Sequence, residues 1–279
     1  MKKNSLVLKF LIPYIISVFG ICVIVYILYF PQYKNRFIRN EGYNINNMTL
    51  ILENKILSLY GKVNIFCSYL EKETDTNKLK TTFVNIVKND KDLMNIYYGG
   101  RVPYKDGGAM LNTVGELSAD YDQTSRGWYK EAMASKDIVV SEPYIDIIDP
   151  TNPIVITFSK AIYDNGILLG VVGVDILFSK IIEDIINNKE YDISIINNNG
   201  LYLHNTNKSY ISKENIFNDS NISNHRDDIL NNDTFGWVEK DKVYMSAKVQ
   251  SFPYILIASM GVEDLQKSLI TLGIVLLAA

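Results

Sequence analysis

Apolar positions in the first part of the chain form one unbroken run. Residues 10–30 carry no charged side chain and are mostly Ile, Leu, Val, Phe and Tyr. A membrane-spanning helix needs about 20 such residues, so we expect a transmembrane helix over 10–30. A cleaved signal peptide has a shorter apolar core that ends in small residues at a cleavage site. Here the run continues into a helical pattern, which favours a retained anchor with residues 1–9 in the cytoplasm.

After this run, apolar residues recur about every 3.5 residues across 31–75, which predicts one long stalk helix. The alternative interpretation is a core helix kinked at Gly61. We favour a long helix whose exposed face pairs with a second copy of the chain, so a homodimer is expected. The apolar positions of the pattern are Ile45, Met48, Ile51, Leu52, Ile56, Leu59, Val63, Phe66 and Leu70.

Residues 76–188 combine helical periods with strand-like alternation and form the larger of two expected modules, the membrane-distal one. Asp164-Asn165-Gly166 is a hairpin-turn signal between two of its strands. The expected helices are 75–88, 125–135 and 178–188, and the expected strands are 93–98, 138–147, 153–163 and 167–176.

Residues 189–262 predict a smaller, membrane-proximal module. The Asn-, Asp- and Ser-rich stretch 205–233 is expected to hold at most one short helix. The expected strands are 191–196, 201–204, 234–239, 242–250 and 254–260. The fold class expected from the whole pattern is α+β, with a long N-terminal helix and two tandem antiparallel-sheet modules.

The last segment, 263–279, predicts a helix that leads into a second, truncated transmembrane helix, because 269–279 is apolar and uncharged. Two spans would place residues 31–268 on the extracytoplasmic side of a bacterial plasma membrane. A cytoplasmic signalling module is then expected beyond residue 279.

Composition narrows the classes of function. The 28 basic and 31 acidic side chains give a net charge of -3 without a basic stripe, so nucleic acid is not an expected partner. Two cysteines and two histidines offer neither a disulfide pattern nor a recognisable metal motif, and we expect no metal and no cofactor. The acidic pairs Asp120–Asp122 and Asp146–Asp149 lack the spacing of a calcium loop. No nucleophile with a neighbouring base is evident, so we do not expect an enzyme.

Three groups between residues 121 and 176 suit a small charged ligand. Arg126, among aromatic residues, offers a rigid fork for a carboxylate, although a surface arginine lying over Trp128 is the commoner arrangement. If Arg126 is helical, it shares a face with Tyr129. Tyr144 and Asp146 point to one side of a strand and can receive an ammonium group, or can form an exposed edge.

Asp175 ends a strand of apolar residues, and a buried carboxylate normally has a partner. That partner is either a ligand ammonium or the first amides of the helix that starts near Phe178. The residues themselves leave these two alternatives open.

The order Tyr121, Arg126, Trp128, Tyr129, Tyr144, Asp146, Asp175 resembles the signature of double Cache (dCache) sensor domains that bind amino acids in bacterial chemoreceptor-like receptors. Three surrounding motifs match as well: Arg-x-Trp-Tyr-x-x-Ala (126–132), Pro-Tyr-x-Asp (143–146) and Gly-Val-Val-Gly-Val-Asp-Ile (170–176). The resemblance implies two PAS-like modules with the ligand in the distal one.

The resemblance also implies the role of each site residue. Tyr121, Arg126 and Trp128 would contact a ligand carboxylate, and Tyr129 would build the same wall. Tyr144, Asp146 and Asp175 would hold the α-ammonium group. The stretch 149–152 is expected near the pocket mouth, where it would alter the preference for a side chain.

The expected function is therefore a transmembrane sensor, most simply a methyl-accepting chemotaxis protein, that binds a free L-amino acid. One alternative keeps the fold but binds an amine or another small metabolite and drives a histidine kinase or a diguanylate cyclase. An alternative of another class is a membrane-anchored extracytoplasmic hydrolase.

Overall fold

The computed structural model describes residues 3–70, 72, 75–135, 137–146 and 154–263. The chain divides into two compact units. Unit 1 comprises Met1–Thr49, Glu190–Val249 and Pro253–Ala279, and unit 2 comprises Leu50–Lys189 and Gln250–Phe252. Helix α1 (Lys3–Leu70) contributes residues to both units and continues without a break through Gly61. Among the described residues, no helix has both the length and the apolar character that crossing a membrane requires.

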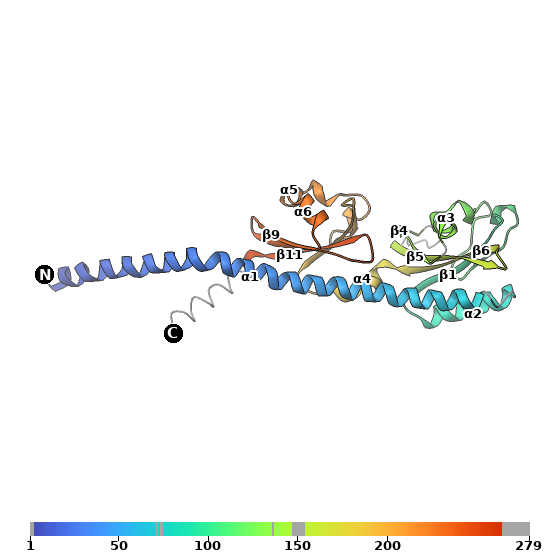
Figure 1. Cartoon of the computed structure of the whole chain (residues 1–279), viewed down its shortest axis with the longest axis horizontal. Helices are drawn as coiled ribbons and strands as arrows, with labels where there is room; N and C mark the ends of the chain where they lie inside the picture. Colours follow the sequence, from blue (N-terminus) through green and yellow to red (C-terminus); the bar gives the residue numbers. More distant parts are fainter. Residues whose placement is uncertain (1–2, 71, 73–74, 136, 147–153, 264–279) are drawn as a thin grey trace. The chain divides into compact units, whose positions relative to one another are not determined.

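Unit 2 contains a six-stranded antiparallel sheet in the order β2-β1-β6-β5-β3, and β4 also pairs with β5. Figure 1 shows α3 on one face of this sheet and α2 on the other. The strands are β1 (Leu93–Gly100), β2 (Met110–Asn112), β3 (Val139–Val140), β4 (Tyr144–Ile145), β5 (Ile154–Asp164) and β6 (Ile167–Leu177). The helices are α2 (Thr76–Asn89), α3 (Gly127–Ala134) and α4 (Phe178–Ile186), with 3-10 turns η1 (Tyr104–Asp106) and η2 (Gln123–Ser125).

Strands β5 and β6 are the longest pair in unit 2, and the expected hairpin joins them. Asn165 and Gly166 both have positive φ values, 49° and 81°. That geometry matches the right-handed twist of the strands and is easiest for Asn and Gly. Residues 170–176 of β6 are buried on both faces. Because side chains alternate along a strand, every second residue from Val171 to Asp175 faces α3.

Two predictions within unit 2 are wrong. The single strand expected over 138–147 is two short strands, β3 and β4. Between them the backbone N–H of Ser141 still donates to the Thr157 carbonyl at 2.9 Å, but the backbone N–H of Thr157 donates to the Ser141 hydroxyl at 3.0 Å in place of a backbone carbonyl. The helix expected over 125–135 begins only at Gly127. Strand β2 was not foreseen.

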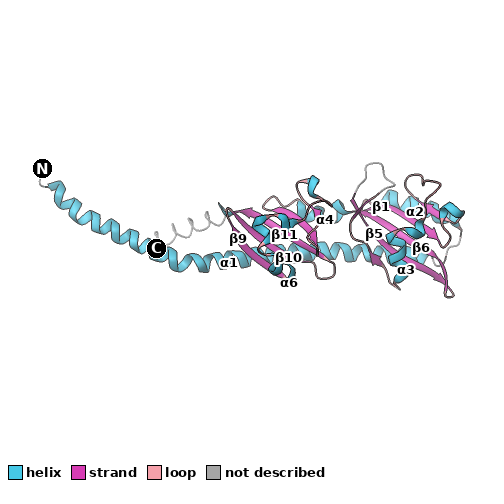
Figure 2. Ribbon diagram, turned by 90° about the horizontal axis from the view of Figure 1, so that it is seen from above, coloured by secondary structure: helices cyan, strands magenta, loops and turns pink. Residues whose placement is uncertain are grey.

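Unit 1 contains a five-stranded antiparallel sheet in the order β8-β7-β11-β10-β9. Helices α5 and α6 cover one face and α1 covers the other (Figure 1), and Figure 2 shows the strands of each sheet side by side. The strands are β7 (Asp192–Asn197), β8 (Tyr202–His204), β9 (Thr234–Glu239), β10 (Lys242–Lys248) and β11 (Tyr254–Gly261). The short helices are η3 (Lys208–Tyr210), η4 (Ile216–Asn218), α5 (Ser220–Ser223) and α6 (Arg226–Asn231).

The expectation of at most one short helix within 205–233 is wrong, because the polar residues there act as helix caps. The side chains of Asn207, Asn215 and Asp219 accept backbone N–H groups at the starts of η3, η4 and α5. Glu263 is helical, whereas the rest of the expected terminal span and the stretch 149–152 lie outside the described residues.

Candidate ligand-binding site

Asp175 is the centre of the candidate site in unit 2. It lies on β6 between β1 and β5, with 2% of its surface exposed. Its Oδ1 accepts the Tyr97 hydroxyl at 2.8 Å and the Thr157 hydroxyl at 2.5 Å. The N-cap of α4 is Leu177, which makes no side-chain capping hydrogen bond. The structure therefore does not contain the alternative in which Asp175 caps the following helix.

The buried carboxyl group of Asp175 is held in an unfavourable environment for its charge. Burial raises the pKa of Asp175 to about 7, and the nearby charge of Asp146 acts in the same direction. The hydrogen bonds from Thr157 and Tyr97 lower this pKa and so oppose the effect of burial. A buried anion is costly unless it is paired. The site is thus electrostatically prepared to receive a cation.

Tyr144 and Asp146 lie near enough to Asp175 to act on its charge. The neighbour between them, Ile145, is 49% exposed, whereas Asp146 is only 4% exposed, so the strand turns both polar side chains inward. The Tyr144 hydroxyl lies 2.6 Å from Oγ1 of Thr157. Burial raises the pKa of Tyr144, and the negative charge of Asp175 raises it further. These groups form one polar cluster at the edge of the sheet.

Arg126 is placed by a tight reversal of the chain rather than by a helix. The side chain of Asp122 accepts the backbone N–H groups of Thr124 and Ser125 and so starts η2. Arg126 follows with φ -75° and ψ 149°, an extended conformation at the N-cap of α3. The expectation that Arg126 and Tyr129 share a helical face is therefore wrong, because Arg126 is not helical.

Tyr121 connects the cationic and anionic parts of the site. Burial raises the pKa of its hydroxyl, while the charge of Arg126 and a hydrogen bond with Trp128 lower it. The charges of Asp175 and Asp146 raise the same pKa. One hydroxyl thus lies within electrostatic reach of the guanidinium group and of both carboxyl groups. Tyr121 is therefore the residue whose hydroxyl is affected by both expected ends of the site.

Trp128 and Tyr129 provide aromatic walls. Both are 5% exposed, and their rings meet edge to face with centroids 5.5 Å apart. The Tyr129 hydroxyl donates a hydrogen bond to the carbonyl of Gly100 at 3.2 Å. Its polar group is thereby engaged by the backbone, and only its ring is available to line a pocket.

Tyr97 and Thr157 are part of the polar cluster but were not foreseen from the sequence. Thr157 stands between Ile156 and Phe158 in β5, and a threonine buried in an apolar strand is a weak signal by itself. Its significance depends on the register, which pairs Thr157 with Asp175. Tyr97 reaches the site from β1, far away in sequence, so no local pattern identifies it.

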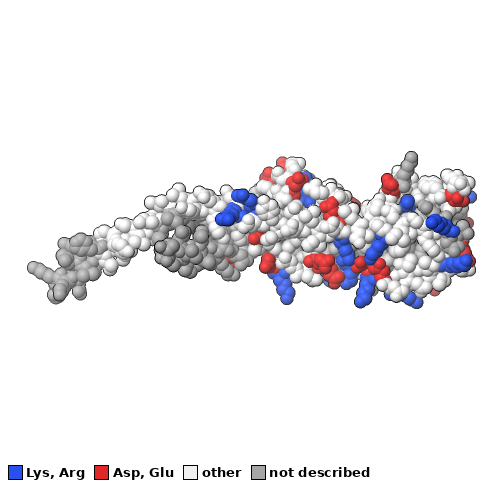
Figure 3. Space-filling model, turned by 60° about the horizontal axis from the view of Figure 1, so that its bottom comes forward, with Lys and Arg blue, Asp and Glu red and all other residues white. Residues whose placement is uncertain are grey.

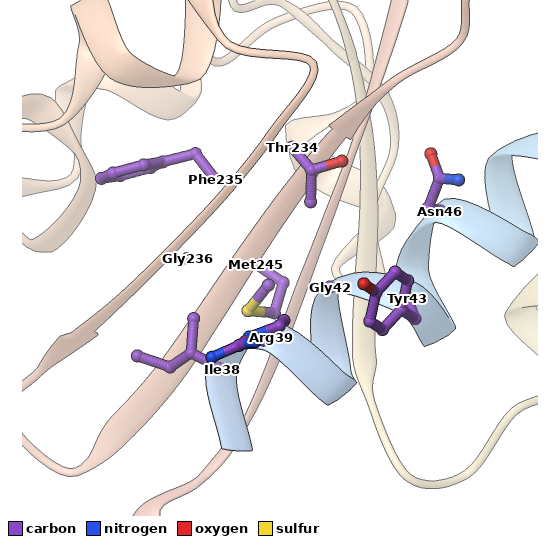
Figure 4. A pocket seen from close by; sticks show the side chains of 9 residues that line it. All are labelled: Ile38, Arg39, Gly42, Tyr43, Asn46, Thr234, Phe235, Gly236 and Met245. Carbon is purple, nitrogen blue, oxygen red and sulfur yellow. The ribbon is translucent and has the colours of Figure 1, made fainter. Parts of the chain in front are cut away.

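A concavity of about 360 Å³ lies in unit 1, between α1 and β9 (Figure 4). Met245, Arg39, Tyr43 and Thr234 are among the residues that line it. Arg39 is the one charged residue in the described lining, and no carboxylate accompanies it. This groove therefore lacks the paired charges that distinguish the cluster around Asp175.

Metal binding and a nucleic-acid surface receive no support from the described residues. Within them, no group of three or more His, Cys, Asp and Glu side chains is suitable for a metal ion. Asp122 instead pairs with Lys105 at 3.0 Å. On the face drawn in Figure 3, basic and acidic side chains lie interspersed over most of the described surface.

Known proteins that resemble this chain include methyl-accepting chemotaxis proteins. Residues 63–183 match the family model "Methyl-accepting chemotaxis protein-like, first PDC sensor domain". Methyl-accepting chemotaxis protein McpC of Bacillus subtilis is 43% identical over 67 residues, which cover 24% of this chain and 10% of that protein. TlpA of the same organism is 25% identical over 177 residues, covering 62% of this chain and 25% of that protein. The chain therefore spans a quarter or less of the length of these relatives.

Solved structures share the fold. The ligand-binding domain of Campylobacter jejuni chemoreceptor Tlp3, in complex with L-norvaline, has a TM-score of 0.65 and 20% identity, covering 83% of this chain and 93% of that one. The domain of Pseudomonas aeruginosa PctC, in complex with GABA, has a TM-score of 0.63 and 16% identity, covering 81% and 99%. The sequence-based resemblance to double Cache sensors of the chemoreceptor kind is confirmed, as are the long N-terminal helix and the two antiparallel sheets.

Proposed function

We propose that this chain, which carries a sensor domain of the methyl-accepting chemotaxis protein type, is the ligand-binding region of a chemoreceptor and binds a free L-amino acid in unit 2. The observation that carries the proposal is the environment of Tyr121, whose hydroxyl lies within electrostatic reach of the cation of Arg126 and of the carboxyl groups of Asp146 and Asp175. A small zwitterion neutralises both kinds of charge at once. The ligands named for related domains, such as L-norvaline and L-serine, support the same class.

In the proposed complex, the two ends of the amino acid have separate partners. The carboxylate contacts Tyr121, Arg126 and Trp128, since a guanidinium group forms paired hydrogen bonds with a carboxylate. The ammonium group contacts Tyr144 on β4, Asp146 directly after β4 and Asp175 on β6, and the ring of Tyr129 lines the wall.

Three observations favour this function over the alternatives. An amine without a carboxylate would leave Arg126 without an anion to bind, so a pure amine fits the site less well. A hydrolase that used a histidine as general base would need one in unit 2, whereas both histidines of the chain, at 204 and 225, lie outside it. The curated relatives are chemotaxis proteins, which supports a chemotaxis module as the output rather than a histidine kinase or a diguanylate cyclase.

The membrane anchor at residues 10–30 remains a proposal that rests on sequence. Support comes from the exposure of large apolar side chains on α1, such as Ile16, Phe19 and Ile27 at 63%, 69% and 62%. Exposed apolar surface of this kind is typical of contact with lipid or with other helices. The anchor would leave residues 31–268 outside the cytoplasm.

A homodimer through α1 is the proposed assembly. Tyr43, Leu50 and Leu57 are spaced by seven residues and are 64%, 46% and 49% exposed. Apolar residues at this interval form a row along one side of a helix, which suits pairing with a second helix. The row lies opposite the buried positions of α1, such as Leu52 and Ile56.

Signalling requires that the ligand favour one conformation over another. In unit 1, β11 ends at Gly261, and residues 262–263 are already helical. A strand that passes directly into a helix transmits a displacement better than a flexible linker does. We therefore place the output of the sensor at the helix that starts after β11.

The test is a thermal-shift measurement on the chain in detergent with each of the twenty standard L-amino acids. One or a few of them should raise the melting temperature, because a ligand that binds only the folded state stabilises it. Arg126→Ala should abolish the rise, and Arg101→Ala, which removes an exposed arginine of unit 2, should preserve it. A folded protein whose melting temperature responds to no amino acid contradicts the proposal.

A further inference from the structure

Tyr97 touches both ends of the proposed amino-acid site. Its hydroxyl donates to Asp175 Oδ1 at 2.8 Å, and its ring meets Trp128 edge to face with centroids 4.8 Å apart. The ring lies directly over Gly173, where a Cβ atom would approach it to 2.2 Å. Only glycine at 173 leaves room for this position of the ring. Tyr97 thus forms a floor between the carboxylate end and the ammonium end.

Thr157 supports Asp175 from the other neighbouring strand. Its side chain is fully buried and donates to Asp175 Oδ1 at 2.5 Å. A hydroxyl has one proton, so the Tyr144 hydroxyl, 2.6 Å from Oγ1 of Thr157, is the donor in that contact. The hydrogen bonds run in one direction, from Tyr144 through Thr157 to Asp175.

The hydroxyls of Tyr97 and Thr157 bond to the same carboxylate oxygen. Hydrogen bonds to the ionised form of a carboxyl group favour that form. Because Oδ1 accepts both hydroxyls, the carboxylate is fixed in orientation, and among the hydrogen bonds of the described residues none reaches Oδ2, which can accept another donor. A ligand ammonium group is such a donor.

We propose that Tyr97 and Thr157 are positioning residues of the amino-acid site, which favour the ionised form of Asp175 and orient it so that Oδ2 receives the ligand ammonium. Tyr97 also fixes the spacing between this end and Trp128. The inference rests on the proposed function and adds two residues to it. Neither residue needs to touch the ligand for this role.

The pH dependence of binding follows from the groups that face Asp175. Three of them are hydroxyls on neighbouring strands: Tyr97 on β1, Thr157 on β5 and Tyr144 on β4. The other two are Asp146, which comes directly after β4, and Tyr121, which lies in the loop before η2. Burial favours the protonated form of Asp175, and the hydroxyls of Thr157 and Tyr97, followed by that of Tyr144, oppose it. Without the hydroxyl of Thr157 or of Tyr97, Asp175 should ionise at a higher pH, and ligand affinity should rise at a higher pH too.

The experiment measures affinity by calorimetry from pH 5.5 to 8.5 on the full chain in detergent, with the twenty standard L-amino acids as probes. For those that bind, Tyr97→Phe and Thr157→Val should weaken binding roughly ten-fold at pH 7, as expected for hydrogen bonds to a charged group. The midpoint of the pH profile should move upward by about one unit or more, and the defect should shrink at pH 8.5. Thr157→Ser, which retains the hydroxyl, should restore the profile.

Tyr98→Phe is the matched control. Tyr98 is the next residue of β1, and its hydroxyl donates to the carbonyl of Leu169 at 2.7 Å, away from Asp175. The control should leave affinity and the pH midpoint unchanged. If Tyr97→Phe behaves like Tyr98→Phe, or weakens binding equally at every pH, the positioning role is wrong. If the wild-type chain binds no amino acid, the proposed function itself fails, and the two failures are distinguishable.

Discussion

Oγ1 of Thr157 lies 2.5 Å from Oδ1 of Asp175, across the paired strands β5 and β6. Both side chains are buried, at 0% and 2% exposure. Thr157 and Tyr97 donate hydrogen bonds to the carboxylate of Asp175, but burial still raises its pKa to about 7. The hydroxyls therefore offset only part of the cost of keeping a charge there. Without ligand, the buried charge of Asp175 lowers the free energy of unfolding, and a bound ammonium group would offset this cost by pairing with the charge.

Asp175→Asn should stabilise the ligand-free protein at alkaline pH. The pKa of Asp175 is raised from 3.8 to about 7 by burial, so the folded state binds more protons than the unfolded state between these values. Wild-type stability should therefore fall as the pH rises through this window and level off above about 7. Asparagine removes this loss, which is on the order of a few kcal/mol.

Denaturant melts of the wild-type chain and of Asp175→Asn at pH 5 and pH 8 measure this difference. The variant should gain stability at pH 8 relative to wild type and little at pH 5, while its response to amino acids disappears. Asp164→Asn, in the exposed hairpin turn, should show no such dependence on pH. Equal effects at both pH values contradict the assignment of the buried charge to Asp175.

Sequence reasoning located the elements and charged groups of unit 2 better than their connections. The β5–β6 hairpin follows from local turn chemistry, because Asn165 and Gly166 tolerate positive φ. Asp175 is conspicuous as a charge in an apolar strand. Its partners, Tyr97 and Thr157, depend on the register of strands distant in sequence, which local patterns do not specify. The extended conformation of Arg126 depends in turn on the cap formed by Asp122.

Ligand binding should release a proton at mildly acidic pH. At pH 6, Asp175 is mostly protonated in the free site, since burial raises its pKa to about 7. An ammonium group beside it favours the ionised form, so about one proton should leave on binding at pH 6 and almost none at pH 8.5. Calorimetry in two buffers with different ionisation enthalpies counts these protons. Apparent enthalpies that agree between buffers at pH 6 would falsify the prediction.

Gly173→Ala should disrupt the site through packing. The added Cβ would lie 2.2 Å from the Tyr97 ring, so the ring must move away from Trp128 and Asp175. Overpacking of this kind costs about 1–3 kcal/mol and should lower the melting temperature and weaken ligand binding together. Gly127→Ala is the matched change, because its Cβ would meet only the Glu131 carboxylate at 3.5 Å. It should leave ligand binding intact, and equal losses in the two variants would count against a specific role of Gly173.

Asp122 should matter to the ligand site although it does not face it. Its side chain caps η2 and pairs with Lys105, and these contacts hold its pKa at about 2. Asp122→Ala should loosen the reversal that presents Arg126 and weaken binding roughly five-fold, the effect of a lost helix cap. Asp122→Asn retains the cap and should lose less. Isothermal titration at pH 7 compares them, and an alanine variant with wild-type affinity would show that Arg126 is positioned by other contacts.

Leu57→Glu should weaken self-association if α1 forms the dimer. Leu57 is 49% exposed and belongs to the row that includes Tyr43 and Leu50. A glutamate from each copy would place like charges at the helix pair, which opposes association. Sedimentation velocity of the chain in detergent should shift from dimer toward monomer, by roughly ten-fold or more in the dissociation constant. Ser58→Glu adds the same charge at the next exposed position, outside the row, and should leave the dimer unchanged. A wild-type chain that is monomeric at tens of micromolar, or a dimer indifferent to both substitutions, would exclude this row as the interface.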